Sequence, residues 1–385
     1  QLLEDQGALF GSKMGWERAN VFAPAGSDRS LRYTWERPDW LAWSCDEQRA
    51  TREAVAVFDQ TSFGKFEVSG ADAEALMQRV CSANVAVEPG RTVYTAMLNT
   101  RGGYEADVTV TRTAADRYLV VTGSASIVRD IDWVSRHLQP GERVAVTDVT
   151  DELAVFGVMG PGSRDLLQPL TATDLSDEEF PFSTSQLLDV RGATVRATRI
   201  TYVGELGWEL YVPVEHAVDV YRALFDAGGA VPAGYYAINS LRLDMGYRAF
   251  GSDLTPDLTP VEAGLMFTCD LSDESDFIGR AAVERVRADG PRRRLASLVV
   301  NDPDVMLWGG ELLRRNGAAV GQVTSAAWSQ TMGAAVGLAY VWQPDGSVVS
   351  VDDVRGDDFV VMVGDRACAV TVSRRAPHRK AEATS

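Results

Sequence analysis

The sequence changes character near residue 290, and this change limits the folds that the chain can adopt. Before it, runs with helical periodicity alternate with short apolar strands. After the three arginines at 292–294, the chain consists of apolar runs separated by turn residues, with hardly any helical periodicity. This pattern predicts a separate C-terminal β domain over residues 286–375. We expect the basic and polar tail, residues 376–385, to be disordered.

The first 285 residues are predicted to form α+β lobes. A chain of 385 residues exceeds the size at which one hydrophobic core stops growing, so two or three lobes are expected in all. Single helices are inserted among short strands that favour antiparallel pairing, which argues against a doubly wound sheet. The clearest strand pair is a hairpin of residues 195–202 and 208–211. Helices are expected at residues 71–80, 125–138, 214–227, 235–247 and 279–288.

The charge balance excludes several classes of partner. The chain has 37 basic and 54 acidic residues, a net charge of −17. Nucleic acid and anionic lipid are negatively charged and bind proteins with an excess of basic residues, so neither is an expected partner. No apolar run approaches the roughly 20 residues that cross a bilayer, and no signal peptide is recognised. Four widely spaced cysteines without a C-x-x-C pair argue against a disulfide framework and favour the cytoplasm.

Familiar metal and dinucleotide motifs are missing from the sequence. The three histidines, His137, His216 and His378, have no metal-binding spacing, so no metal site is expected. No G-x-G-x-x-G motif follows a strand, and we therefore expect no FAD or NAD in this chain. The glycine-rich residues 157–164 favour a strand, tight turn and helix, with an anion-binding turn as the alternative.

Three segments are candidates for chemistry. In residues 94–108, a strand runs into a Gly-Gly turn and Asp107 opens the next strand, either as a functional carboxylate or as a turn cap. In residues 201–209, Glu205 lies between two glycines flanked by aromatic residues, where a planar ligand could approach closely. In residues 240–253, a helix that carries Arg242 is followed by a segment with aromatic residues and glycines. Arg242 could take part in the chemistry, or it could equally be a structural arginine that bridges two lobes.

Together these segments resemble the glycine-cleavage T-protein (aminomethyltransferase) family, and in particular the folate-binding half of sarcosine and dimethylglycine dehydrogenases. The motifs that carry the resemblance are residues 13–18 (KMGWER), 57–66 (VFDQTSFGKF), 94–99 (YTAMLN), 102–107 (GGYEAD), 179–184 (EFPFST), 202–209 (YVGELGWE), 246–248 (GYR), 260–265 (PVEAGL) and 277–280 (FIGR). The resemblance implies a three-lobed cloverleaf around a central tetrahydrofolate channel. Residues 1–285 would form two interleaved antiparallel α+β lobes, and residues 286–375 a C-terminal β-barrel.

The resemblance also implies roles for individual residues. Asp107 matches the family's catalytic aspartate near N10 of the folate, and Glu205 matches the glutamate that holds the pterin ring. Arg242 occupies a helix position near the folate tail. Tyr94 and Asn99 line the same channel by resemblance.

Physical chemistry is consistent with these roles. A carboxylate such as Glu205 can accept two adjacent N–H donors from the edge of a pterin. A flat heterocycle needs aromatic or apolar walls, for which Tyr202, Trp208 and Phe250 are candidates. Asp107 near N5 and N10 would stabilise the positive charge that develops as a one-carbon unit joins or leaves the folate, or would exchange the amine proton.

The function implied by the resemblance is a tetrahydrofolate-dependent one-carbon transferase. It would capture formaldehyde or an iminium from the demethylation of a small amine as 5,10-methylenetetrahydrofolate, with a separate flavoprotein as a candidate partner. The T-protein has two aspartates where this sequence has Ala106 and Asp107, which matches the dehydrogenase branch. Two alternatives remain open: a demethylase that passes a methyl group from an N-, O- or S-methyl donor to folate, and a non-catalytic folate-binding or partner subunit of a flavoprotein.

Overall fold

Strands β3 (Ala56–Asp59) and β9 (Leu153–Met159) pair in one sheet, although an entire second sheet lies between them in the sequence. In the computed structural model, which describes residues 1–378, the first sheet has the strand order β10-β11-β12-β9-β3-β13. Its other strands are β10 (Ser185–Val190), β11 (Ala193–Thr198), β12 (Gly207–Pro213) and β13 (Val231–Ala233). Only the β13–β3 pair is parallel. The second sheet is therefore an insertion, and the two lobes are interleaved as expected.

The inserted sheet is antiparallel throughout and has the order β5-β6-β7-β4-β8. Its strands are β4 (Gly64–Ser69), β5 (Thr92–Leu98), β6 (Tyr104–Ala114), β7 (Arg117–Thr122) and β8 (Ala145–Asp148). Helices α3 (Ala73–Val80) and α4 (Ile127–Arg136) cover it. Apolar residues from both helices, including Leu76 and Val134, share one buried core with Phe66 of the sheet. This core fixes the strands that carry Tyr94 and Asp107.

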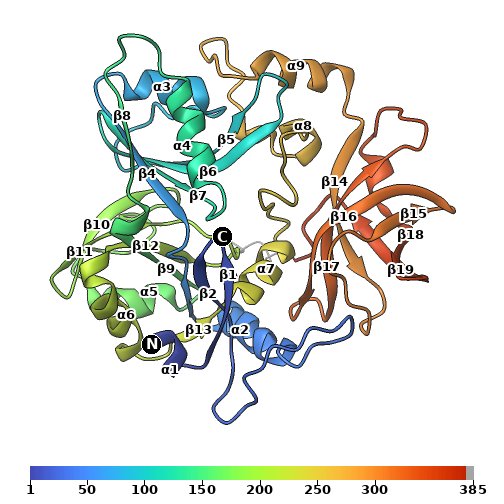
Figure 1. Ribbon diagram of the computed structural model, residues 1–385, viewed down its shortest axis with the longest axis horizontal. Coiled ribbons are helices and arrows are strands. Elements are labelled where there is room, and N and C mark those ends of the chain that lie inside the picture. Colours follow the sequence, from blue (N-terminus) through green and yellow to red (C-terminus); the bar gives the residue numbers. More distant parts are fainter. Residues whose placement is uncertain (379–385) are drawn as a thin grey trace.

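The C-terminal β domain is a closed six-stranded barrel in the order β14-β17-β16-β15-β18-β19, on the right of Figure 1. Its strands are β14 (Arg293–Val300), β15 (Leu312–Arg315), β16 (Ala318–Ser329), β17 (Ala334–Trp342), β18 (Gly356–Val363) and β19 (Arg366–Ser373). Inward-facing residues such as Leu298, Val323 and Val361 form its core. The α+β class with a separate β domain is thus confirmed.

The remaining helices lie in the first lobe and at its borders with the other two lobes. They are α1 (Leu2–Asp5), α2 (Leu41–Glu53), α5 (Ser163–Leu167), α6 (Ala217–Asp226), α7 (Tyr235–Asp244), α8 (Pro260–Ala263) and α9 (Arg280–Asp289), with an N-terminal hairpin of β1 (Ala8–Lys13) and β2 (Trp16–Phe22). Helix α7 lies near the centre of Figure 1, where it packs against α2, β2 and the barrel strand β16. The first lobe and the barrel therefore meet at α7.

Two local expectations are corrected by the structure. The helix expected over residues 214–227 begins with a 3₁₀ turn (Val214–His216), and Val214 and Val218 of its predicted apolar stripe are exposed. The strand expected over residues 195–202 ends at Thr198. The Thr201 hydroxyl then accepts from the backbone N–H groups of residues 203 and 204, which makes a local turn in place of the sheet ladder.

Most of the expected disordered tail, residues 379–385, lies outside the described residues. Before it, the backbone N–H of His378 donates to the carbonyl of Asp244 at 2.9 Å. The chain that leaves the barrel is therefore in contact with the end of α7 up to the last described residue.

Candidate active site

Tyr94 and Asp107 form a hydrogen-bonded pair on neighbouring strands. Ala96 of β5 lies opposite Asp107 of β6, so Tyr94 lies two residues away on the same face of the sheet. Its hydroxyl donates to Oδ2 of Asp107 at 3.1 Å. Strand β6 already begins at Tyr104, so Asp107 does not open the strand, and the turn-cap interpretation is wrong.

Burial raises the pKa of Asp107 from 3.8 to about 6. The hydrogen bond from Tyr94 opposes this shift, because it stabilises the carboxylate form. The nearby negative charges of Asp130 and Asp253 add to it. A carboxyl group with a pKa close to neutrality can both hold and release a proton under physiological conditions.

Asn99 organises the turn between β5 and β6. Its side-chain nitrogen donates to Oε1 of Glu105 and to the Pro256 carbonyl, both at 3.1 Å. Its side-chain oxygen accepts the backbone N–H groups of residues 101 and 103. Gly103 is required here, since a Cβ atom would lie 1.9 Å from the Pro256 carbonyl oxygen. The four hydrogen bonds use both the donors and the acceptor of the Asn99 amide within the protein, so Asn99 is assigned to the framework of the site.

Glu205 lies in the turn between β11 and β12 and is nearly buried, with 9% of its surface exposed. Its Oε1 accepts from Nη1 of Arg52 at 2.9 Å. Arg52 belongs to the last turn of α2, and its other terminal nitrogen, Nη2, pairs with the fully buried Asp244 at 3.1 Å. Neither α2 nor Arg52 was predicted from the sequence.

Two stacked tyrosines connect the surroundings of Asp107 with those of Glu205. The rings of Tyr202 and Tyr247 stack at 6.0 Å between centroids, and the Tyr202 hydroxyl donates to the Arg248 carbonyl at 2.7 Å. Burial raises the pKa of Tyr202, and the negative charge of Asp107 raises it further. Burial also raises the pKa of Tyr247, which responds in addition to the charges of Arg52 and Glu205. Tyr202 is therefore within electrostatic range of Asp107, and Tyr247 is within electrostatic range of Glu205.

Two further aromatic side chains, Phe250 and Phe267, lie on the side of the candidate site that contains Asp107. The guanidinium of Arg129 lies 4.3 Å from the centre of the Phe250 ring, and Arg129 also pairs with Asp130 at 3.2 Å. Phe267, with 74% of its surface exposed, lies 6.3 Å from Tyr94 between ring centroids. Phe267 was not predicted from the sequence, and an exposed phenylalanine beside this pair is available to a ligand.

Trp208 is not brought into this group, whereas Arg242 lies beside the group, with Nη1 donating to the backbone carbonyl of Tyr247 at 2.9 Å. Trp208 is fully buried in the core of the first lobe, edge-on to Phe180 at 6.0 Å, so it has no surface to offer as a ligand wall. Arg242 is buried and pairs with Asp253 at 2.6 Å. Asp253 also accepts from Thr324 and Ser325 of the barrel, which makes Arg242 part of a connection between α7 and the barrel.

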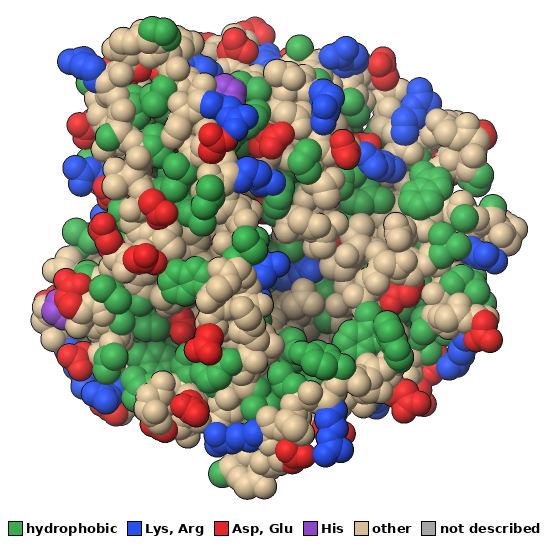
Figure 2. All heavy atoms as spheres, in the orientation of Figure 1, with side chains coloured by type: hydrophobic (Ala, Val, Ile, Leu, Met, Phe, Trp, Pro, Cys, Tyr) green, Lys and Arg blue, Asp and Glu red, His purple; other side chains and the backbone are tan. Residues whose placement is uncertain are grey.

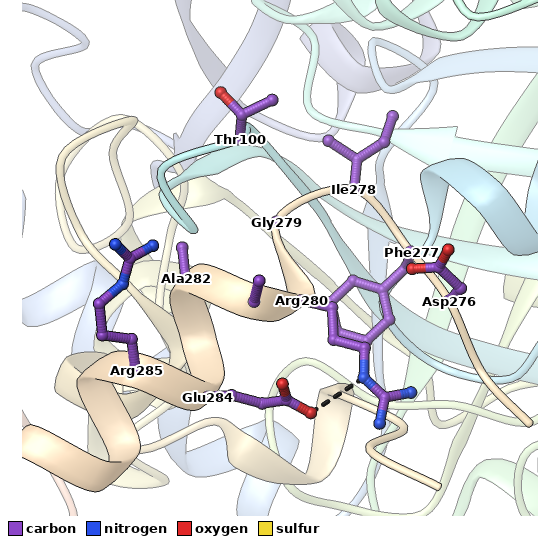
Figure 3. Close-up of a pocket in the computed structure, with 10 residues that line it drawn as sticks. Thr100, Asp276, Phe277, Ile278, Gly279, Arg280, Ala282, Glu284 and Arg285 are labelled. Atoms are coloured by element: carbon purple, nitrogen blue, oxygen red, sulfur yellow. Dashed lines mark hydrogen bonds and ion pairs between the residues drawn. The ribbon is translucent and has the colours of Figure 1, made fainter. Parts of the chain in front are cut away.

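Figure 2 shows a hollow at the centre of the molecule, with basic side chains at its bottom. In the same orientation, helix α7 lies at this centre in Figure 1, with the strands β5–β7 to its upper left. A second concavity, of about 370 Å³, lies at the start of α9 and is lined by residues 276–282, 284 and 285 with Thr100 (Figure 3). No residue predicted for the site lines it. Within it, Arg280 is occupied by Glu284 and by backbone carbonyls.

Within residues 1–378, no group of three or more His, Cys, Asp or Glu side chains is arranged to hold a metal ion. In the same part of the chain, no helix is long and apolar enough to span a membrane. The four cysteines are all free.

Comparison with known proteins identifies the family. Residues 1–273 match the model of the GCVT N-terminal domain, and residues 293–377 match that of the glycine cleavage T-protein C-terminal barrel domain. Mouse mitochondrial sarcosine dehydrogenase is 39% identical over 92% of this chain. The chain spans only 43% of the length of that relative. The aminomethyltransferase of Bacillus subtilis is 33% identical, over 83% of this chain and 88% of its own length.

A solved structure shows the same fold. The aminomethyltransferase T of the Bartonella henselae glycine cleavage system superposes with a TM-score of 0.83, covering 98% of this chain and 95% of that one at 23% identity. The expected T-protein architecture is therefore confirmed. The two domain matches and the nearly full-length bacterial relative establish that this chain belongs to the glycine cleavage T-protein (aminomethyltransferase) family.

Proposed function

We propose that this chain is a tetrahydrofolate-dependent one-carbon transferase. It would capture the formaldehyde or iminium released by demethylation of a small amine and yield 5,10-methylenetetrahydrofolate. The observation that carries the proposal is the buried Tyr94–Asp107 pair, with two stacked tyrosines of which one is influenced by Asp107 and the other by the Glu205–Arg52 pair. Family membership supports tetrahydrofolate as the cofactor.

The residues present fit a reduced folate. A pterin ring is flat and carries adjacent N–H donors, which a fixed carboxylate such as Glu205 can accept in a bidentate geometry. Tyr202, Tyr247 and Phe250 provide aromatic surface for the rings. We assign Glu205 to the pterin edge and these aromatic side chains to the walls. Asn99, Trp208 and Arg242 would support the site through the framework instead of touching the folate.

Tetrahydrofolate supplies the nitrogens N5 and N10, which carry the one-carbon unit when it is bound. Asp107 would stabilise positive charge near these nitrogens and would hold or release the amine proton, for which a pKa of about 6 is well placed. Tyr94 would keep the carboxylate of Asp107 in one orientation through its hydrogen bond. Phe267 would shield the outer side of this pair from water.

We propose that the one-carbon unit comes from the oxidation of a methylated amine at a different active site. The matching part of sarcosine dehydrogenase is less than half of that protein. We therefore propose that a flavoprotein, either as a partner or as a further region, oxidises the methylated amine, and that the present chain receives the product.

The test uses the purified chain, tetrahydrofolate and ¹³C-labelled formaldehyde, with product formation followed by NMR or mass spectrometry. The proposal expects 5,10-methylenetetrahydrofolate to form faster than by the uncatalysed condensation, and this acceleration to be lost in Asp107→Asn. Formation of 5-methyltetrahydrofolate from a methyl donor would favour the demethylase alternative. Folate binding without any acceleration would favour the non-catalytic alternative.

A further inference from the structure

We infer that Arg52 is a positioning residue that fixes Glu205 for folate binding, an inference that rests on the proposed function. Glu205 lies outside the strands, in the segment between the end of β11 at Thr198 and the start of β12 at Gly207. No sheet hydrogen bonds run through the middle of this segment, because Thr201 closes a local turn there. Contacts from another element are therefore needed to set the direction of the Glu205 carboxylate.

Arg52 supplies these contacts with one terminal nitrogen. Nη1 donates to the backbone carbonyl of Val203 at 2.6 Å and to Oε1 of Glu205 at 2.9 Å. The same nitrogen thus holds both the backbone of the turn and the side chain that the turn presents. Only 11% of the Arg52 side chain is exposed, so the pair is shielded from competing water.

The other terminal nitrogen anchors Arg52 itself. Nη2 donates to Oδ2 of Asp244 at 3.1 Å and to the backbone carbonyl of Leu241 at 3.3 Å, both at the C-terminal end of α7. Asp244 is fully buried, which limits the movement of its carboxylate. The planar guanidinium therefore ties the Glu205 turn to α7, while α2 carries the arginine.

A lysine could not make the same set of contacts. Four hydrogen bonds from two nitrogens of one rigid plane determine an orientation, whereas an ammonium group is a single point charge on a flexible stem. Arg52→Lys would keep the positive charge and lose the fork. This difference separates positioning from simple charge neutralisation.

The role of Arg52 is also distinguishable from that of Asp107. The Tyr94–Asp107 pair is held by β5 and β6 and has no hydrogen bond or ion pair to Arg52. A change at Arg52 should therefore weaken folate binding through Glu205 and leave the rate at saturating folate close to that of the parent.

The experiment compares the parent chain with Arg52→Gln, Arg52→Lys and Glu205→Gln, using calorimetry with tetrahydrofolate and the transfer assay. Arg79→Gln is the matched control, since Arg79 also pairs with a carboxylate, Glu142, but in the inserted lobe. We expect Arg52→Gln to raise the Kd about tenfold or more, and Arg52→Lys to raise it by an intermediate factor of about three to five. The control should keep the parental Kd, and all three arginine variants should keep kcat within about threefold.

The double variant Arg52→Gln/Glu205→Gln provides the decisive comparison. If Arg52 affects folate binding only through Glu205, this variant should bind folate within about twofold of Glu205→Gln alone, because the carboxylate that Arg52 positions is already absent. If the losses of folate affinity in the two single variants add up in the double variant, the inference is overturned. It is also overturned if Glu205→Gln binds folate more weakly than the parent while Arg52→Gln keeps the parental affinity. If Arg52→Gln does not fold, parental affinity in Arg52→Lys overturns it. Failure of the parent to bind tetrahydrofolate would instead refute the proposed function.

Discussion

The hydroxyl of Tyr94 donates to Oδ2 of Asp107 at 3.1 Å across the β5–β6 ladder. Burial raises the pKa of the Asp107 carboxyl group to about 6, and this hydrogen bond opposes the shift. Burial favours the protonated acid, and the tyrosine donor favours the carboxylate. Together with the nearby negative charges of Asp130 and Asp253, these two effects set the pH range in which Asp107 changes its charge.

Replacing Tyr94 by phenylalanine should move this range upward. If the carboxylate of Asp107 is the active form, transfer activity of the parent falls as the pH decreases through about 6. Tyr94→Phe removes a contact that lowers the pKa of Asp107, so the acid limb of the pH profile should shift to higher pH. Tyr118→Phe is the control, because the hydroxyl of Tyr118 is buried in the same lobe and has no hydrogen-bond partner in the described structure. An unchanged acid limb in Tyr94→Phe would argue against Asp107 as the titrating group.

Glu205→Gln is expected to weaken tetrahydrofolate binding more than Asp107→Asn does. Loss of a charge-assisted pair of hydrogen bonds to the pterin should cost roughly 1.5–3 kcal/mol. Asp107→Asn should keep the affinity within a few-fold, since its proposed role concerns the reacting nitrogens. Calorimetry of both variants measures the difference directly. Equal affinity of Glu205→Gln and the parent would remove Glu205 from the site.

Arg242→Gln should reduce stability more than it affects the chemistry. Arg242 and Asp253 are both buried, so removal of the arginine leaves an uncompensated carboxylate between α7 and the barrel. Breaking a buried pair in this way costs about 3–5 kcal/mol. Urea unfolding is the measurement. A variant of parental stability that no longer binds folate would place Arg242 in the ligand site after all.

The purified chain should show no flavin absorbance. The glycine-rich residues 157–164 form the end of β9, a turn and the five-residue helix α5. Gly160 is explained by packing, since a Cβ atom there would lie 2.4 Å from the Ala54 carbonyl oxygen of the segment after α2. We therefore expect a colourless protein whose amine-oxidising activity requires an added flavoprotein. A stoichiometric flavin band that survives gel filtration would contradict this.

The sequence was sufficient to predict the class of fold. The hairpin of β11 and β12 and the change to a β domain follow from local periodicity, which the structure confirms. Helix α2 was missed because its buried face is largely polar, with Ser44, Glu47 and Gln48 in place of an apolar stripe. Glu47, for example, accepts the backbone N–H groups of Phe22 and Gly234. Such a face has no hydrophobic period to detect.

The composition of the site could be predicted only in part, because burial depends on long-range contacts. Trp208 and Glu205 are three residues apart, and the motif suggested a common site for both. The structure places the tryptophan inside the core of the first lobe, on strand β12, while Glu205 stays in the preceding turn. Arg52 is separated from Glu205 by 153 positions in the sequence, and only the fold brings the two together.

The central claim is tested most directly by the rate at which ¹³C-formaldehyde is transferred to saturating tetrahydrofolate by the parent and by Asp107→Asn. If Asp107 stabilises the developing positive charge, the variant should bind tetrahydrofolate within a few-fold of the parent and transfer the label about 10²-fold more slowly. Calorimetry on the same samples establishes that the site is filled. A variant that binds tetrahydrofolate and transfers the label at the parental rate would contradict the account.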